Sequence, residues 1–218
     1  MLKIKNLNVK NVLTDLNLTV NRDEFVLVVG DNGAGKTTLF NAISGNIKPK
    51  NGNILIDDRD VTDMPPYERA VVVANVFQDP KIGTIGSMTI RENLNMAYMR
   101  GKKRALSICN SAERDKLYRE KLRTLGMGLE NRLDDCVGNL SGGQRQALSI
   151  IMSLITDSKI LLLDEITAAL DTKAADRIIE IMDENIRQQK KTCLMITHNA
   201  KQIDKLGDRV LVLKNGHL

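Results

Sequence analysis

The chain has 218 residues, of which 42% are hydrophobic, enough for one sizeable domain or for a core with an inserted subdomain. Its apolar runs are far shorter than the roughly 20 residues that cross a bilayer, so we expect no membrane-spanning segment. The net charge of +5 is spread along the chain except at Arg100–Arg104, which a solvated loop also explains. With no tryptophan and 3% aromatic residues, a surface that stacks nucleic-acid bases is not expected, and we predict no nucleic-acid partner.

The N-terminal stretch MLKIKNLNVKN alternates apolar and polar residues like a half-buried strand. It lacks the apolar core and cleavage site of a signal peptide, so we expect the protein in the cytosol. The cysteines Cys109, Cys136 and Cys193 are odd in number and widely scattered. This spacing predicts ordinary thiols rather than a disulfide framework or a metal site.

The first chemical motif, GDNGAGKTT at 30–38, follows the predicted strand FVLVV and precedes a predicted helix that ends near Gly45. The pattern is that of a P-loop, whose backbone N–H groups close around phosphate oxygens. A plain glycine turn with an exposed lysine is the alternative, which the flanking strand and helix disfavour. Lys36 would reach the β and γ phosphates, and the Thr37 hydroxyl would hold Mg²⁺. The predicted nucleotide contacts are Asn32, Gly33, Ala34, Gly35, Lys36, Thr37 and Thr38.

Two further predicted strands end in polar residues. KILLLDE ends in Asp164, which would orient Mg²⁺, and in Glu165, which could polarise an attacking water, although both acids could simply solvate a strand end. TCLMITH ends in His198, and a lone histidine there is more often a capping residue. Ligands of open α/β sheets bind beyond the carboxyl ends of the strands, so we expect these groups to converge.

The stretch NLSGGQRQALSIIMSLI predicts a second helix N-terminus, with Ser141 as the cap and two glycines that expose their N–H groups. Such a terminus attracts phosphate. A flexible glycine hinge before a buried helix is the alternative.

At LSGGQ, Leu140 to Gln144, the sequence resembles the nucleotide-binding subunit of ATP-binding-cassette transporters, of the bacterial import type. The P-loop, VFQDP, LSGGQ, ILLLDE, TAALD and the histidine occur in the family's order over nearly all of the chain. The resemblance implies an ATP hydrolase that uses ATP and Mg²⁺. It implies catalytic roles for Lys36, Gln78, Glu165 and His198, and a Mg²⁺ site at Thr37, Gln78 and Asp164.

The resemblance also implies a homodimer in which two chains, head to tail, sandwich two ATP molecules. Each signature loop would then contact the partner's nucleotide through Ser141, Gly142, Gly143 and Gln144, with Asp171 nearby. Asp171 also fits an N-cap, and Gln78 also fits a plain surface residue. In this family an aromatic residue before the P-loop stacks on adenine, but none precedes Phe25 here, which leaves aliphatic candidates such as Val9 and Val12.

The implied fold class is α/β: a P-loop NTPase core with a mostly parallel sheet, an N-terminal antiparallel β subdomain and an inserted helical subdomain. We place the core at residues 1–78 and 158–218, and the helical subdomain with the signature motif at 79–157. In the family this subdomain receives coupling helices of a membrane partner. Candidates for that groove are Met88, Ile90, Leu94 and Met96, with ordinary packing as the alternative.

The resulting hypothesis is a peripheral ATPase at the cytoplasmic face of the membrane, recruited by integral membrane permease subunits and indirectly served by a substrate-binding protein. Stretches such as SMTIRENLNMAYMRG resemble import ATPases paired with a tryptophan or other amino-acid binding protein. A soluble cassette ATPase of DNA repair or translation is the alternative, for which a coiled coil or a second cassette would be expected. A module that binds nucleotide without hydrolysis is disfavoured by the intact Lys36, Asp164, Glu165 and His198.

Overall fold

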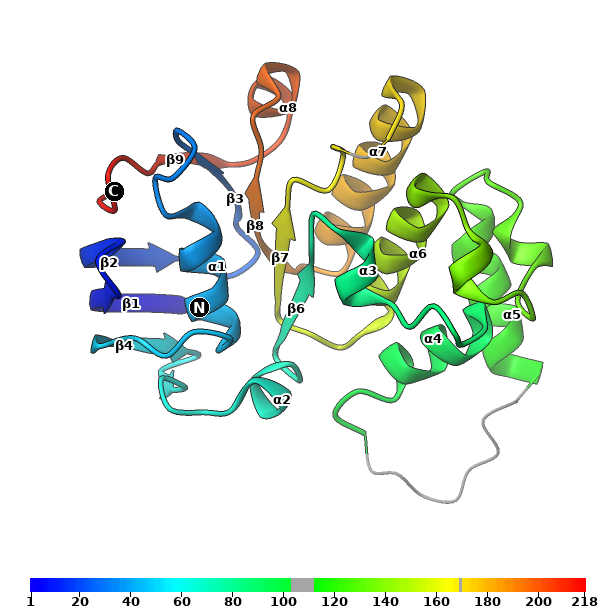
Figure 1. Cartoon of the computed structure of the whole chain (residues 1–218), viewed down its shortest axis with the longest axis horizontal. Coiled ribbons are helices and arrows are strands. Elements are labelled where there is room, and N and C mark those ends of the chain that lie inside the picture. The colour runs from blue at the N-terminus through cyan, green and yellow to red at the C-terminus, as the bar shows by residue number, and fades with distance from the viewer. Residues whose placement is uncertain (103–111, 169) are drawn as a thin grey trace. The chain divides into compact units, whose positions relative to one another are not determined.

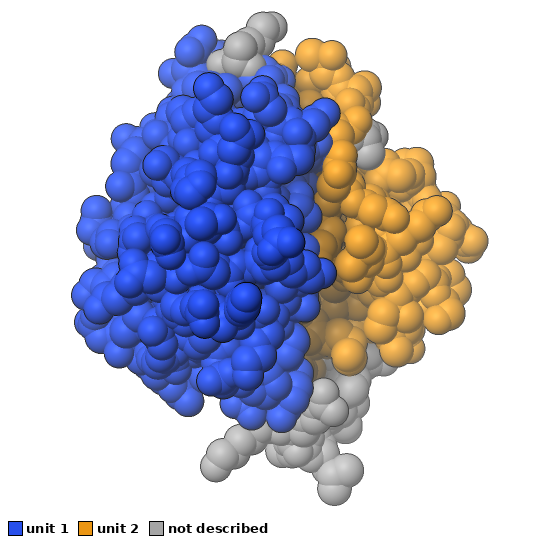
Figure 2. All heavy atoms as spheres, turned by 60° about the vertical axis from the view of Figure 1, so that its left-hand side comes forward, with its two compact units in different colours: residues 1–75, 158–165, 189–218 blue, residues 76–157, 166–188 orange. Residues whose placement is uncertain are grey.

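The computed structural model describes residues 1–102, 112–168 and 170–218 (Figure 1). The chain forms two compact units, which Figure 2 shows in separate colours. We call Met1–Asn75, Ser158–Glu165 and Gln189–Leu218 the core unit, and Val76–Asp157 and Ile166–Gln188 the helical unit. This division differs from the sequence-based one at residues 76–78 and at Ile166–Gln188, which both fall in the helical unit. The helix in the second stretch packs on a helix of that unit.

The core unit begins with an antiparallel sheet that lies against the first helix in Figure 1. Its strand order is β2-β1-β4-β5. The strands are β1 (Leu2–Val9), β2 (Leu13–Val20), β4 (Asn51–Ile56) and β5 (Arg59–Asp60). In β1 the residues Leu2, Ile4, Leu7 and Val9 are buried. Alternation explains each pair, and a register shift between Ile4 and Leu7 brings both pairs to the buried side.

A second, five-stranded sheet has the order β6-β7-β8-β3-β9. Strands β7, β8, β3 and β9 run parallel to their neighbours in this order. The strands are β3 (Phe25–Val29), β6 (Val73–Val76), β7 (Ile160–Asp164), β8 (Thr192–Ile196) and β9 (Arg209–Val212). The apolar runs FVLVV, ILLLD and TCLMI are thus strands, as predicted, and most of their residues are buried, as in a sheet covered on both faces.

Helix α1 (Lys36–Ser44) leaves β3 through the glycine-rich loop and ends at Gly45, whose left-handed φ of 84° allows its amide to donate to the Ala42 carbonyl oxygen at 3.2 Å. The helix contributes Leu39, Phe40 and Ile43 to one hydrophobic cluster. This cluster also contains the inner face of the antiparallel sheet and one face of the parallel sheet. The unit is completed by two short helices, α2 (Pro66–Arg69) and α8 (Ala200–Lys205).

The described residues of the helical unit are mostly helical. Its elements are α3 (Pro80–Gly83), α4 (Ile90–Tyr98), α5 (Ala112–Arg123), η1 (Leu129–Asn131), η2 (Val137–Asn139), α6 (Gly142–Ile155) and α7 (Thr172–Gln188). Helix α6 is buried along most of its length and contacts α3, α4, α5 and α7. Within the described ranges, no helix combines the length and apolar character needed to cross a membrane.

Candidate nucleotide site

The loop 30–38 has the backbone that its glycines permit. Gly33 and Gly35 have left-handed φ angles of 83° and 105°. A Cβ added at Gly30 would come within 2.1 Å of the Leu213 carbonyl oxygen, so a side chain does not fit there. The loop is also tied to the C-terminal turn, because the Gly216 amide donates to the Ala34 carbonyl oxygen at 3.1 Å.

The Lys36 side chain lies inside this loop, with 7% of its surface exposed. Its Nζ donates to the carbonyl oxygens of Gly30 at 2.7 Å and Asp31 at 2.9 Å. A buried ammonium is tolerated where it is hydrogen-bonded in this way. The loop therefore holds one positive charge at its centre.

The start of α1 presents further donors. Gly35 is the N-cap and offers no side-chain acceptor, and the Leu39 amide donates to the Gly35 carbonyl oxygen at 2.8 Å. The amides before Leu39 belong to the first turn, which receives no acceptor from within the helix. These amides, the positive end of the helix dipole and Lys36 together fit a polyphosphate chain.

Asp164, the last residue of β7, lies beside the start of α1. Asp164 and Val28 both stand opposite Ile196 of β8, so β7 and β3 end within one residue of each other. The Thr37 hydroxyl hydrogen-bonds the Asp164 carboxyl. Burial and the neighbouring Glu165 charge raise the pKa of Asp164 above its ordinary value of 3.8, against the opposing effects of Thr37 and Lys36.

A hydroxyl and a carboxylate are oxygen ligands that Mg²⁺ binds together with phosphate oxygens and water. No group of three or more histidine, cysteine or acidic side chains able to hold a metal occurs in the described part of the chain. Thr37 and Asp164 would offer Mg²⁺ two protein oxygen ligands, and phosphate oxygens and water would supply the others.

The side chains of Glu165 and His198 are in polar contact, with 3.0 Å between Glu165 Oε1 and His198 Nε2. Glu165 has a left-handed φ of 45°, which is unusual for a residue with a side chain. Its amide donates to the Ile196 carbonyl oxygen at 3.2 Å, which fixes the backbone at the end of β8. The carboxylate is thereby held beside the histidine at the carboxyl edge of the sheet.

Two residues that sequence reasoning missed hold the turn that carries His198. The Thr197 hydroxyl donates to Gln202 Oε1 at 2.5 Å and accepts from the Asn199 amide at 3.1 Å. Both Thr197 and Gln202 are buried. A threonine after a strand and a glutamine in a short helix give no sequence signal for this contact.

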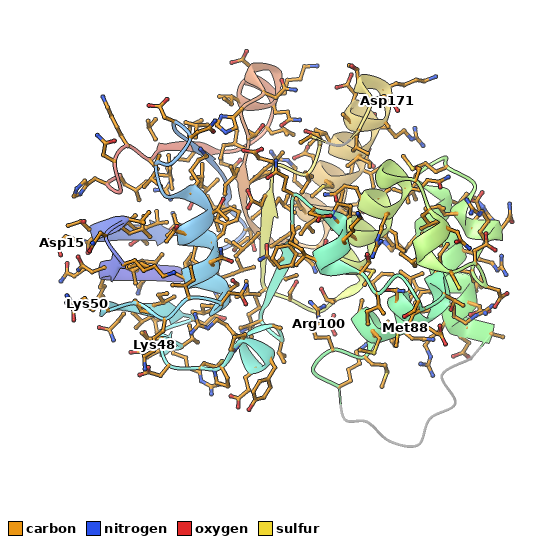
Figure 3. All side chains as sticks on the ribbon, viewed as in Figure 1. Asp15, Lys48, Lys50, Met88, Arg100 and Asp171 are labelled. Atoms are coloured by element: carbon orange, nitrogen blue, oxygen red, sulfur yellow. The ribbon has the colours of Figure 1, made fainter. Side chains whose placement is uncertain are left out.

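The remaining predicted residues lie in the helical unit. Ser141 caps α6 through a capping box: its hydroxyl accepts from the Gln144 amide at 3.2 Å, and its own amide donates to Gln144 Oε1 at 3.2 Å. Asp171, labelled in Figure 3, accepts from the Ala174 amide at 3.0 Å near the start of α7. The capping interpretation of Asp171 is therefore confirmed. Gln78 is an exposed residue that lies just before the start of α3.

The four groove candidates divide into two groups. Ile90 and Leu94 are fully buried, which confirms ordinary packing for them. Met96 is 52% exposed, and Met88, labelled in Figure 3, is half-buried. Of the two aliphatic adenine candidates, Val9 lies in the core. Val12 lies closer to the surface, next to Gly35.

Among the described cysteines, Cys136 is exposed and Cys193 is buried, and neither forms a disulfide bond with the other. Cys109 and the basic residues Lys103 and Arg104 lie outside the described residues.

A glycine-rich phosphate loop between a parallel strand and a helix, with an acidic pair at the end of a nearby strand, defines a P-loop nucleoside triphosphatase. The profile of the family described as ABC transporter matches residues 13–168. The chain belongs to the ATP-binding-cassette transporter family, and it is an ATP-hydrolysing subunit of such a transporter.

Similar proteins and solved structures support the assignment to this family. The chain is 42% identical to the tyrosine transport ATP-binding protein of Clostridioides difficile, over 100% of this chain and 90% of that protein. It is 33% identical to the thiamine import ATP-binding protein ThiQ of Shigella sonnei, over 92% and 82% of the two chains. A solved ATP-binding cassette, a dimer in a post-hydrolysis state bound to ADP and Pi, superposes with a TM-score of 0.87 at 28% identity, covering 100% and 96%.

Proposed function

We propose that the protein hydrolyses ATP with Mg²⁺ at two composite sites of a head-to-tail homodimer, and that this drives import of an amino acid through permease subunits. The proposal places it at the cytoplasmic face of the membrane. The Glu165–His198 contact at 3.0 Å, beside the Asp164–Thr37 contact, is the observation that carries it.

In this proposal, the first-turn amides of α1 and Lys36 bind the phosphates. Lys36 exchanges its bonds to the Gly30 and Asp31 carbonyl oxygens for phosphate oxygens. Thr37, Asp164 and Gln78 hold Mg²⁺, which neutralises charge on the β and γ phosphates. Glu165 orients and polarises the attacking water, and His198 holds the Glu165 carboxylate in place.

The second half of each site comes from the partner chain. Ser141 is exposed at the start of α6, and Gly142 and Gly143 leave its first amides uncovered by side chains. A γ-phosphate bound by one chain would accept from these donors of the other chain, with Asp171 nearby. The dimeric state of the solved cassette with ADP and Pi supports this arrangement.

The identity of the cargo rests on the relatives. The tyrosine transport protein matches 100% of this chain at 42% identity, against 92% of this chain at 33% identity for the thiamine import protein. An amino acid, and an aromatic one in particular, is therefore the proposed cargo. A substrate-binding protein would deliver it to the permease.

The dimer is tested with Glu165→Gln, which keeps the size of the side chain but removes the carboxylate that polarises water. We expect this variant to run as a dimer in size exclusion with saturating Mg-ATP and as a monomer without nucleotide. Adding Lys36→Ala should abolish the dimer, because the phosphates lose their central charge. A Glu165→Gln chain that stays monomeric with bound Mg-ATP would contradict the sandwich.

The cargo is tested by uptake of labelled tyrosine, tryptophan and thiamine in cells that carry Glu165→Gln in place of the native chain. Uptake of an aromatic amino acid should fall to background while thiamine uptake is unchanged. Loss of thiamine uptake alone would overturn the amino-acid proposal and leave the ATPase proposal intact.

A further inference from the structure

A short segment of the helical unit, Phe77–Thr84, carries Gln78 and α3, and it lies against the first two turns of α6. A Cβ added at Gly83 would come within 2.9 Å of the Ser149 hydroxyl, so the two backbones approach closely here. We call this stretch the Gln78 segment. Two neighbouring side chains of α6, Arg145 and Gln146, bind its two ends.

Gln146 holds the first end. It has no exposed surface, and its Nε2 donates to the Phe77 carbonyl oxygen at 3.2 Å. Its Oε1 is buried and has no partner among the residues that the structure describes. A buried amide with one unsatisfied atom costs stability compared with an apolar side chain of the same size. Packing alone therefore does not explain a glutamine at this position.

Arg145 holds the other end. Its Nε donates to the Thr84 hydroxyl at 2.5 Å, and its Nη2 donates to the Thr84 carbonyl oxygen at 3.1 Å. The same hydroxyl donates to the Pro80 carbonyl oxygen at 2.7 Å, which closes α3 on itself. Thr84 is 6% exposed, so these hydrogen bonds are shielded from water.

Beyond Thr84 the chain is anchored on α4. The Ile85 amide donates to Asn93 Oδ1 at 2.8 Å, and Asn93 Nδ2 donates to the Ile85 carbonyl oxygen at 3.0 Å. The Gln78 segment is thus fixed by paired hydrogen bonds and not by apolar contact alone. Such polar pairs fix one register, because a shift by one residue breaks all of them.

We propose that Arg145 and Gln146 are positioning residues for ATP hydrolysis, which hold the Gln78 segment on the signature helix so that Gln78 and the signature amides reach the nucleotides together. The proposal rests on the proposed roles of Gln78 and Ser141–Gln144. Both side chains lie within one turn of Gly143. If the start of α6 moves when it binds a γ-phosphate, Gln146 and Arg145 therefore move Phe77 and Thr84 with it.

The test uses isosteric variants of the purified full chain, assayed for ATP hydrolysis over a range of Mg-ATP concentrations. Gln146→Met fills the same volume without a donor, and Thr84→Val removes the hydroxyl that meets Arg145. We expect kcat to fall about three- to tenfold in each, as for the loss of one net hydrogen bond. The KM for ATP should change less than twofold, since the phosphate loop lies in the other unit.

Two controls separate positioning from stability. Thr84→Ser restores the hydroxyl and should restore kcat to within twofold of the native value. Ser153→Ala removes a buried hydroxyl of the same helix that donates to the Ile150 carbonyl oxygen, away from the Gln78 segment, and it should leave kcat unchanged. The thermal midpoint of each variant is measured beside its kinetics.

The positioning proposal would be overturned if folded Gln146→Met and Thr84→Val both kept a native-like kcat in an assay in which Lys36→Ala is inactive. Failure of the proposed ATPase function would give a different result, because Lys36→Ala would then hydrolyse ATP as fast as the native chain. If the variants do not fold, hydrogen exchange on Glu165→Gln decides the matter. Mg-ATP should slow exchange of the amides 77–84 and 142–146 together, and protection of 142–146 alone would overturn the coupling.

Discussion

Ser141 has two separable roles, and substitution with alanine or aspartate distinguishes them. Its hydroxyl caps α6 by accepting from the Gln144 amide at 3.2 Å, and in the proposed function it also donates to the partner's γ-phosphate. Alanine removes both roles. Aspartate keeps a capping acceptor and suits the positive helix end, but it places a negative charge where the phosphate binds.

The two effects differ in size. Loss of the cap costs about 1 kcal/mol, which for 218 residues lowers the thermal midpoint by about 2 °C in Ser141→Ala. A carboxylate and a phosphate charge about 4 Å apart repel by about 4 kcal/mol at an effective dielectric constant near 20, a factor of roughly 1,000 at each site. Ser141→Asp should therefore melt above Ser141→Ala and yet dimerise far less readily.

Both variants are built in the Glu165→Gln chain. Scanning calorimetry gives the thermal midpoint, and light scattering over a range of Mg-ATP concentrations gives the dimer fraction. Equal dimerisation of the aspartate and alanine variants would refute the phosphate contact. A lower midpoint for the aspartate variant would refute the capping argument.

Two further predictions concern the core unit. Because burial and Glu165 raise the pKa of Asp164 above 3.8, the folded chain binds the proton more tightly than the unfolded chain, and native stability falls as pH rises through the folded pKa. Asp164→Asn should therefore match the native midpoint near pH 3 and exceed it at pH 7, while Mg²⁺-dependent hydrolysis is lost; a lower midpoint at pH 7 would contradict this. Gly30→Ala should cost about 1–3 kcal/mol in urea unfolding, because its Cβ meets the Leu213 carbonyl oxygen at 2.1 Å. Gly33→Ala is its control: alanine there carries the strain of a left-handed φ, about 1–2 kcal/mol, but no atom lies within 4 Å of the added Cβ. An equal cost at both glycines would argue against the close contact.

The strands and the phosphate loop were predictable because each has a local cause in the sequence. Short apolar runs ending in Gly30, Asp164 and the Thr197–His198 turn are typical of parallel strands with ligands at their carboxyl edge, and the fold class that followed is confirmed. The caps at Ser141 and Gly45 have equally local signals.

Side-chain partners were less predictable, because they depend on packing between distant segments. Ile90 and Leu94 are four residues apart and share the buried face of α4, whereas Met96, two residues further, lies on the exposed side. Helical spacing alone would have distinguished the buried pair, Ile90 and Leu94, from the exposed Met96. The left-handed φ of Glu165 and the hydrogen bond from Arg145 to Thr84 have no comparable signal in the sequence.

The order of strands in the parallel sheet constrains how the nucleotide site forms during synthesis. Strand β3, which leads into the phosphate loop, pairs on one side with β8 and on the other with β9, both from the last thirty or so residues of the printed sequence. Its loop is also closed by Leu213 and Gly216. Since a ribosome delivers β8, β9 and Gly216 long after β3, the nascent chain acquires its ATP-binding pocket only once these later segments have been made, and long-range pairing of this kind folds slowly.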